Sequence, residues 1–399
     1  MLPVAIVGAG IGGLAAALAL SGRGRPVVVL ERRTALDEAG AGVQLSPNAS
    51  RVLIDLGLGP ALRRISTEPP RVAIRRLSTG EPIGAVVLGP SVRQRFGAPY
   101  WVVSRADLHR VLLDAVRGRP DVRLLVGRSV SAVSEGRDAV TLTVDKAGGR
   151  ETLDADAAVG ADGLWSSLRR AVGDGRSPAF RGAVAWRATV PRGAVPAELS
   201  GDETGLWLGR GGHLVHYPIA GGQLVNVVAI HRRPEPVEGW SAPGNPAELR
   251  AALGPLALPL QQLLHAPAEW RLWSLHDLPA RAMAKGRTAL LGDAAHPVLP
   301  TLAQGAALAV EDAACLAQAL GGGGPVAPAL ARYAALRLKR ARKVQAAARR
   351  NAAVYRLPWP ADLARDLVIR RLGPEGMIER HAWLYGWAPD GVDRPGRAG

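Results

Sequence analysis

Two short, wholly apolar runs near the N-terminus are separated by a glycine-rich turn and a helix-like stretch. Residues 4–7 and 27–30 contain only valine, alanine, isoleucine and leucine, the pattern of strands that are buried on both faces of a parallel sheet. Residues 8–13 read Gly-Ala-Gly-Ile-Gly-Gly, and residues 14–20 are rich in alanine and leucine. The pattern therefore predicts a complete strand–helix–strand unit at the start of the chain.

Beyond this unit the pattern of apolar positions changes several times between strand and helix. A loop is expected over residues 42–48, followed by a helix that the glycines at 57 and 59 end. Short buried strands are expected at 157–159 and 288–291. The other expected elements are strand pairs within 72–103, a helix over 105–116, strands at 122–126 and 140–144, an antiparallel sheet over 183–230, a helix over 302–320, a flexible break at 321–324 and a mostly helical remainder.

Length and composition indicate a globular protein of two closely packed domains. The chain has 399 residues, of which 48% are hydrophobic and 21% charged. No apolar run reaches the roughly 18–20 uncharged residues of a membrane span, and no metal site is expected. The N-terminus lacks the basic segment and cleavage site of a secretory signal. The single cysteine, Cys315, cannot form an internal disulfide, so we expect a cytoplasmic protein.

The formal net charge of +16 raises the question of nucleic-acid binding. The basic residues are spread along the chain, however, and aromatic residues make up only 4% of it. The densest group, residues 337–343 followed by 349–350, lies in a strongly helical stretch and is expected to be a solvated helix face. We therefore expect no nucleic-acid partner, and leave open that the charge steers an anionic substrate or nicotinamide nucleotide.

The glycine-rich turn has the spacing of a dinucleotide-binding motif. Gly8 permits the tight turn, Gly10 allows the backbone to approach a pyrophosphate, and Gly13 allows the helix to pack closely on the strand. The N–H groups at the helix N-terminus then face the phosphates. Glu31 ends the second strand, where a ribose hydroxyl needs an acceptor. We expect an α/β fold with a discontinuous, Rossmann-type domain and an inserted β-sheet domain.

Two later strand ends favour FAD over NAD as the bound dinucleotide. Asp162-Gly163 follows one buried strand and Gly292-Asp293 follows another. An aspartate in such a position suits a cofactor hydroxyl, and for Asp293 the natural partner is the ribityl chain of FAD. The alternative is that each aspartate only caps the turn that follows it.

With these motifs the sequence resembles the class A flavoprotein aromatic hydroxylases, which share the para-hydroxybenzoate hydroxylase fold. The resemblance is greatest to the branch of salicylate hydroxylase and 3-hydroxybenzoate 6-hydroxylase, and it runs from about residue 4 to about residue 388. The matching segments are 8–13 (the ADP-binding motif), 160–169 (the DG motif), 292–297 (the GD motif), 41–49, 104–108, 215–218 and 383–387.

The resemblance implies a division of the chain and a set of FAD-binding residues. The FAD-binding domain comprises 1–72, 104–180 and 276–322, the substrate domain comprises 73–103 and 181–275, and 323–399 form a helical C-terminal region. The residues expected to bind FAD are Gly8, Gly10, Gly12, Gly13, Glu31, Arg32, Gln44, Arg105, Asp162, Gly292, Asp293, Pro297, Gly305 and Ala306.

The resemblance also implies a reaction. FAD reduced by NADH or NADPH reacts with O2 to a flavin hydroperoxide, which delivers one oxygen atom to a small phenolic or benzoate-like ring. The sequence contains no second glycine-rich motif for a stably bound nicotinamide, so the reductant is expected to bind transiently. The choice between NADH and NADPH, and whether the chain forms a homodimer, stay open.

His213 is the expected base that removes the phenol proton. Strand alternation places His213, Val215 and Tyr217 on one face, so His213 and Tyr217 can face the same pocket. Gln304 is expected near the flavin ring, where it can bond to substrate or flavin. His296 is expected to be structural, and Arg187 either binds a substrate carboxylate or forms an ordinary salt bridge. Pro300-Thr301 departs from the resembling enzymes, so the ring pocket is expected to be altered.

Three other functions remain open from the sequence. A related monooxygenase could hydroxylate, epoxidise or oxidatively decarboxylate a larger natural-product ring. A flavin oxidase or dehydrogenase would insert no oxygen. An FAD-dependent sensor or nucleic-acid-binding regulator would show salt-sensitive DNA binding.

Overall fold

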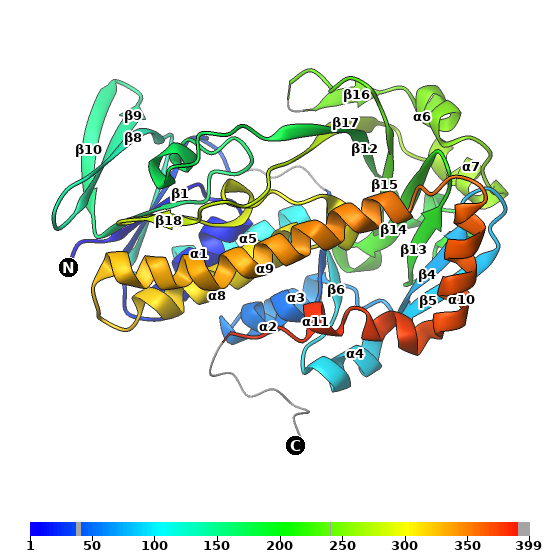
Figure 1. Cartoon of the computed structure of the whole chain (residues 1–399), viewed down its shortest axis with the longest axis horizontal. Helices are drawn as coiled ribbons and strands as arrows, with labels where there is room; N and C mark the ends of the chain where they lie inside the picture. The colour runs from blue at the N-terminus through cyan, green and yellow to red at the C-terminus, as the bar shows by residue number, and fades with distance from the viewer. Residues whose placement is uncertain (37–40, 240, 390–399) are drawn as a thin grey trace.

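The computed structural model describes residues 1–36, 41–239 and 241–389. Figure 1 shows an N-terminal α/β part and a large antiparallel sheet side by side, with the long helix α9 (Val326–Val354) running along both. The mixed α/β class expected from the sequence is confirmed.

The N-terminal part is built on a six-stranded sheet in the order β18-β19-β11-β1-β2-β7. Its central strands are parallel, and every residue of β1, β2 and β11 is buried. Such strands need apolar residues on both faces, which explains why their sequences carry no alternation. The sheet comprises β1 (Val4–Val7), β2 (Val27–Glu31), β7 (Val122–Val126), β11 (Ala157–Gly160), β18 (Ala284–Lys285) and β19 (Thr288–Leu290).

The second large sheet has eight strands in the order β16-β17-β12-β15-β14-β13-β4-β5. All of its pairings are antiparallel except that of β13 with β4. We call it the substrate sheet. It comprises β4 (Arg71–Arg76), β5 (Pro82–Val87), β12 (Ala179–Pro191), β13 (Thr204–Leu208), β14 (Gly212–Ile219), β15 (Leu224–Arg232), β16 (Ala242–Gly244) and β17 (Trp270–Asp277).

The structure differs from the expected secondary structure at two places. The loop predicted over 42–48 contains a strand, β3 (Gly42–Leu45), which pairs with β6 (Trp101–Ser104). The stretch predicted as strand pairs also contains the helix α4 (Gly89–Phe96), which begins with glycine and proline. The strand β3 is short, and the strand that it pairs with lies far along the chain. The local pattern of apolar residues therefore does not predict it. The remaining strands, β8 (Ser129–Glu135), β9 (Val140–Lys146) and β10 (Gly149–Ala155), form a three-stranded sheet.

The helix predicted over 302–320 begins later than expected. Pro300–Leu302 form a 3-10 turn and Ala303 has a φ of 53°, so the α-helix α8 spans Gly305–Leu320. Within the described ranges no helix is both long and apolar enough to cross a membrane. The other helices are α1 (Ile11–Ser21), α2 (Pro47–Asp55), α3 (Gly59–Ile65), α5 (Arg105–Arg117), α6 (Pro246–Leu253), α7 (Leu258–His265), α10 (Ala361–Glu379) and α11 (Ala382–Tyr385).

Candidate functional site

One large cavity, of about 830 Å³, lies where the two parts of the molecule meet. Its walls come from one face of the substrate sheet, from β3, from the N-terminal end of α8 and from the C-terminal helices α9, α10 and α11. A volume of this size lies within the range of small-molecule and cofactor sites. The walls are mainly aliphatic and aromatic, and their charged side chains are Arg105, Arg187, Asp293, Arg350, Arg365 and Arg380.

The register of the substrate sheet determines which of its side chains face this cavity. His213, Val215 and Tyr217 of β14 pair with Ile230, Val228 and Asn226 of β15. Paired residues on adjacent strands point to the same face of a sheet. His213, Val215 and Tyr217 all line the cavity, together with Val228 and Ile230, as the alternation along the strand predicts.

His213 lies deep in the cavity wall, and its imidazole makes no hydrogen bond within the part of the chain that the structure describes. Only 2% of the residue is exposed, and its buried Nδ1 has no partner there. The imidazole meets the Tyr355 ring edge-on, with the centroids 5.1 Å apart. Burial, reinforced by the charge of Arg356, lowers the pKa of His213 to about 3. His213 is therefore a neutral imidazole over the whole physiological range.

Tyr217 of β14 packs against the strand β3. A Cβ atom at Gly42 would lie 2.4 Å from Tyr217 Cε2, so only glycine fits there. The Gly42 amide donates a 2.8 Å hydrogen bond to Asn226 Oδ1. Burial raises the pKa of Tyr217, while Arg187 and a hydrogen bond with Gln44 oppose that rise. These contacts fix β3 against the substrate sheet.

Gln304 opens α8 beside the cavity, but its side chain is engaged within the protein. Its Nε2 donates to Ser46 Oγ over 2.9 Å, and its Oε1 accepts from Asn48 Nδ2 over 3.0 Å. The residue is only 1% exposed. These bonds favour a role in holding the loop before α2 over direct contact with a substrate. Its neighbours Gly305 and Ala306 line the cavity.

The glycine-rich turn has the shape of a phosphate cradle. Gly8 has a φ of 110°, and a Cβ atom there would lie 2.5 Å from the Ala161 carbonyl oxygen. A Cβ atom at Gly13 would lie 2.0 Å from the Gly8 carbonyl oxygen, and one at Gly12 would meet Leu291 and Ala309. These three glycines thus serve close packing. A Cβ atom at Gly10 would meet nothing within 4 Å, so this side of the turn is open to a pyrophosphate.

The strand β2, which follows the glycine-rich turn and α1, ends in Glu31, whose carboxylate is held by two backbone hydrogen bonds. Glu31 is 6% exposed, and its Oε2 accepts a 2.9 Å hydrogen bond from the Ala9 amide in the turn. Its Oε1 accepts from the Arg33 amide. The neighbouring Arg32 is exposed. The carboxylate therefore lies beside the turn, where a ribose hydroxyl would bind.

The two later aspartates differ in their surroundings. Asp162 Oδ2 accepts from both the amide and the hydroxyl of Ser167, so this residue caps the turn that follows it. Asp293 instead faces the cavity beside Arg105, the first residue of α5. Burial raises the pKa of Asp293, while His296 and Arg105 oppose the rise. No hydrogen bond to the Asp293 carboxylate is found within the described residues, and an acceptor on the cavity wall suits the ribityl chain, so the residues present fit FAD.

A buried ionic cluster lies behind the GD motif and corrects the expectation that residues 337–343 form a solvated helix face, because Arg337 is only 1% exposed. Asp312 Oδ2 accepts from His296 Nε2 over 2.6 Å and from the Gly292 amide over 2.9 Å. Its Oδ1 accepts from Arg337 Nε over 2.6 Å, and Arg337 also pairs with Glu311. Although burial disfavours an imidazolium, the Asp312 carboxylate raises the pKa of His296. These contacts favour a structural role for His296, as expected from the sequence. The carbonyl oxygen of the neighbouring Pro297 accepts a hydrogen bond from Gln345 Nε2.

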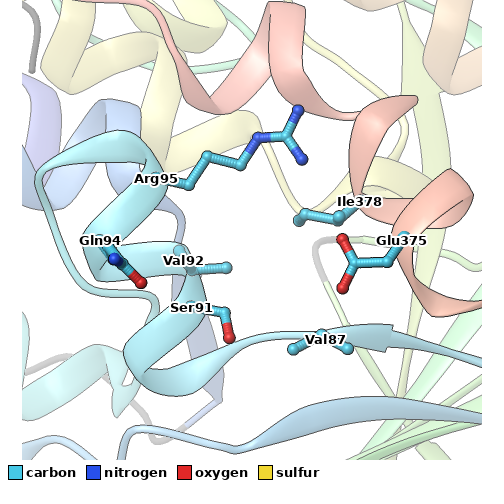
Figure 2. A pocket seen from close by; sticks show the side chains of 7 residues that line it. All are labelled: Val87, Ser91, Val92, Gln94, Arg95, Glu375 and Ile378. Atoms are coloured by element: carbon cyan, nitrogen blue, oxygen red, sulfur yellow. The ribbon is translucent and has the colours of Figure 1, made fainter. Parts of the chain in front are cut away.

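A second hollow lies apart from this site, on the surface between α4, β5 and α10. Figure 2 shows Arg95 on one side of it and Glu375 and Ile378 on the other. Its polar side chains, Ser91, Gln94, Arg95 and Glu375, are exposed. None of them is buried and directed at a ligand, so the large cavity is the candidate site.

Residues 1–348 match the model of the family described as the FAD binding domain. The chain belongs to this family. It is 38% identical over 389 residues to 3-amino-4-hydroxybenzoate 2-monooxygenase PtmB3 of Streptomyces platensis, covering 96% of each chain. It is 33% identical to 3-hydroxybenzoate 6-hydroxylase of Polaromonas naphthalenivorans, over 97% of this chain and 96% of that one. A solved salicylate hydroxylase substrate complex superposes with a TM-score of 0.82 at 28% identity, covering 97% and 96%.

The family match and these relatives together confirm the resemblance, the cofactor and the type of enzyme. The chain is an FAD-dependent monooxygenase of the aromatic hydroxylase group, which uses O2 and NAD(P)H. The individual site residues stay predictions. Those that line the cavity are Gln44, Arg105, His213, Tyr217, Asp293, Gln304, Gly305 and Ala306.

Proposed function

We propose that this FAD-binding family member hydroxylates a phenolic carboxylic acid the size of a hydroxybenzoate, with His213 as the base. The observation that carries the proposal is the neutral, unbonded imidazole of His213 on an otherwise largely apolar cavity wall that also bears arginine side chains. The relatives' names include two hydroxylated benzoates as substrates, which agrees with this chemistry.

The role of His213 follows from its charge state. A neutral imidazole can accept the phenol proton, whereas an imidazolium cannot. Its pKa of about 3 describes the protein without a ligand, since burial and Arg356 both disfavour the charged form. A phenolate formed beside the ring would favour the imidazolium, because opposite charges within a few ångströms stabilise one another. Proton transfer and substrate binding are therefore coupled at this residue.

FAD would be held by the open side of Gly10, by Glu31 and by Asp293, with Arg105 close to Asp293. When bound, FAD supplies the reduction of O2 and the transfer of one oxygen atom to the ring. The protein's own contribution is a shaped, largely apolar lining. Leu384 and Tyr385 of α11 and apolar residues of α10 line the cavity together with the substrate sheet, and such a lining would help to exclude water from the reacting atoms.

The experiment is NADH and NADPH oxidation by the purified, FAD-loaded protein across hydroxybenzoates, aminohydroxybenzoates, uncharged phenols and larger phenolic ring systems. Product and peroxide are assayed in the same samples. We expect one phenolic acid to accelerate oxidation and to yield a hydroxylated product with little peroxide.

Two outcomes contradict the proposal in different ways. If oxidation is accelerated only by uncharged or larger rings, the benzoate-sized acid is wrong, and the volume of the cavity then favours the larger substrate. If peroxide forms in proportion to NADH and no ring is hydroxylated, the protein is an oxidase.

A further inference from the structure

A short segment near the end of the described chain forms part of the cavity wall but has little structure of its own. This C-terminal strap, residues 381–387, contains a single helical turn, α11, which lies beside α2 (Figure 1). Its Trp383, Leu384 and Tyr385 line the cavity. An isolated turn is not stable in water, because helix nucleation is unfavourable. Contacts with the rest of the protein must therefore hold this part of the wall in place.

Arg340 of α9 caps the C-terminal end of α11. The last carbonyl groups of a helix have no partner within the helix. The Arg340 guanidinium donates from Nη1 to the Trp383 carbonyl oxygen and from Nη2 to the Leu384 carbonyl oxygen, each over 3.0 Å. Its Cζ lies 5.5 Å from the centroid of the Trp383 ring, and Lys343 Nζ lies 4.3 Å from the same centroid. Two cations of α9 therefore hold the strap.

A buried carboxylate binds the same guanidinium. Arg340 Nε donates to Glu311 Oε2 over 3.0 Å, and Arg340 Nη2 donates to Glu311 Oε1 over 2.7 Å. Glu311 lies on α8 and is fully buried, while the Arg340 side chain is 11% exposed. Two bonds between a guanidinium and a carboxylate fix the plane of the guanidinium. The place of the cap on α11 is therefore set by Glu311.

Glu311 is also connected to the part of the cavity wall at the N-terminal end of α8. Its Oε1 accepts a 2.6 Å hydrogen bond from Asn48 Nδ2, which also donates to Gln304 Oε1 over 3.0 Å. Asn48, Gln304 and Glu311 are each at most 1% exposed. Gln304 lines the cavity, as do its neighbours Gly305 and Ala306. A continuous chain of hydrogen bonds, which we call the Arg340 link, therefore joins two parts of the cavity wall that are distant in sequence.

Neighbouring arginines of α9 do not share this arrangement. Arg342 is exposed, and its Nε donates to a backbone carbonyl oxygen outside the strap. Arg337 pairs with Glu311, but its printed contact with the strap is with the Trp387 ring, whose centroid lies 5.2 Å from Arg337 Cζ. Arg340 differs from both because it hydrogen-bonds to the strap and to Glu311 at once.

We propose that Arg340 is a positioning residue, which places the strap and the wall at Gln304 relative to one another and so keeps water from the reacting atoms. The inference goes beyond the proposed function, because it concerns how a ring is enclosed and not which ring is bound. Water that enters the cavity diverts the reaction. NADH, O2 and a proton then give NAD+ and H2O2, and the ring is left unchanged. Loss of the Arg340 link should therefore raise the amount of peroxide formed per NADH.

Arg340→Lys separates a positioning role from a merely structural one. Lysine keeps a charge beside Glu311 but lacks the planar fork that reaches two carbonyl groups and the carboxylate together. FAD content and melting temperature should therefore stay close to the wild-type values. Amide hydrogen exchange of the FAD-loaded protein should become about ten-fold faster or more over residues 382–387, the change expected for losing a hydrogen bond to a charged group. It should also become faster over residues 304–308.

Peroxide formation is the second measurement. With the ring that the protein hydroxylates best, R340K should form at least about three-fold more peroxide per NADH than the wild type, because water reaches the reacting atoms. R342K is the matched control, since Arg342 lies on the same helix and also donates to a backbone carbonyl oxygen. It should change neither the exchange of the strap nor the yield of peroxide.

Asn48→Ala breaks the Arg340 link at its other end. Exchange over residues 304–308 should become faster, while residues 382–387 keep the wild-type rate, because Arg340 and Glu311 remain in place. In the double variant R340K/N48A the effect over residues 304–308, taken as the logarithm of the rate, should be smaller than the sum of the two single effects, as for residues of one network. Additive effects would overturn the proposal, since they would show two independent contacts.

Four other results would overturn the proposal. Unchanged exchange of the strap in R340K would show that Arg340 does not hold it, and faster exchange confined to the strap would show a cap without a link to Gln304. Faster exchange in both segments with unchanged peroxide would remove the role in excluding water. Faster exchange along the whole chain, or the same changes in R342K, would show a general structural effect. The exchange measurements need no substrate, so they decide the link even if no hydroxybenzoate is converted and the proposed function fails.

Discussion

At the scale of single residues, β14 buries two histidines on opposite faces of the substrate sheet. His213 faces the cavity, whereas His216 packs against Gly205 and the Trp207 ring. Both are 2% exposed. Burial is the main cause of a low pKa in both cases, about 3 for His213 and about 4 for His216. The folded protein therefore resists protonation at both positions, where the unfolded chain does not, and burial lowers the pKa of His231 and His381 in the same direction.

His213→Asn should lower kcat for the best substrate by roughly two to four decades, the usual effect of losing a general base, while FAD stays bound. Stopped-flow reduction by NADH and the FAD content provide the controls. In the wild type, kcat/KM should show no loss near pH 6.5, because the pKa of about 3 keeps His213 neutral there. A wild-type kcat in the variant would remove the assignment.

Acid should destabilise the folded protein through the same histidines. Their folded pKa lies below the unfolded value of about 6.5, so this stability is complete above pH 6.5 and lost as the pH falls toward 4. Between pH 6.5 and 5 each should cost about 1.5 kcal/mol of unfolding free energy. His296, whose pKa is raised, loses its contribution only as the pH rises above 6.5, so it does not disturb this window.

Urea unfolding at several pH values measures the effect. His216→Gln should lower the slope without abolishing it, whatever its effect on stability at neutral pH, because the pKa values of His213, His231 and His381 are lowered as well. A slope that the substitution leaves unchanged would show that His216 is not a buried neutral imidazole.

At the scale of elements, α8 and α9 meet through the buried cluster of Glu311, Asp312 and Arg337. Asp312 also holds the Gly292 amide and His296, so one carboxylate connects two helices with the turn that presents Asp293. Asp312→Asn should lower the unfolding free energy by about 3–5 kcal/mol, because it leaves Arg337 short of a partner in the interior. It should also weaken FAD binding.

Asp114→Asn is the matched control for that experiment. Asp114 and Arg117 form an exposed pair 3.9 Å apart on α5, and exposed pairs contribute only about 0–1 kcal/mol. Similar losses of unfolding free energy in Asp114→Asn and Asp312→Asn would contradict the role given to the cluster.

Elements whose pattern is complete within a few residues were predictable, and those that depend on distant partners were not. The wholly apolar β1 and β2 were recognised because burial on both faces demands that composition. β3 was missed, since its ladder is completed by β6 far along the chain. Alternation along β14 gave His213 and Tyr217 correctly as neighbours in the cavity.

The same distinction holds within the site. The bonds from Gln304 to Ser46 and Asn48 join positions more than 250 residues apart. That Arg187 forms no ion pair within the described residues depends on every element packed around it. Neither could be deduced from local sequence, because both are properties of tertiary packing.

At the scale of the whole molecule, the protein carries a formal net charge of +16, and its reductant, NADH or NADPH, is a polyanion. Reduction by NADH should slow as ionic strength rises, and reduction by NADPH more so, because long-range attraction is screened within about 10 Å at 0.1 M salt. Stopped-flow second-order rate constants between 20 and 300 mM salt measure this.

A neutral N-benzyl dihydronicotinamide, which lacks the phosphates, is the control and should show little dependence on salt. The same dependence for the neutral and charged reductants would mean that salt acts on the flavin site itself and not on the encounter.

The parallel pairing of β1 with β11, and of β11 with β19, has a consequence for how the chain is made. β1 cannot be enclosed until residue 160 has been synthesised, and the sheet is complete only after residue 290. The wall of the cavity made by α9, α10 and α11 follows later still. A nascent chain therefore exposes its apolar strands until these later segments have been made, and FAD can be loaded only after them. The supply of free FAD at that moment, and a chaperone before it, would set the yield of active enzyme.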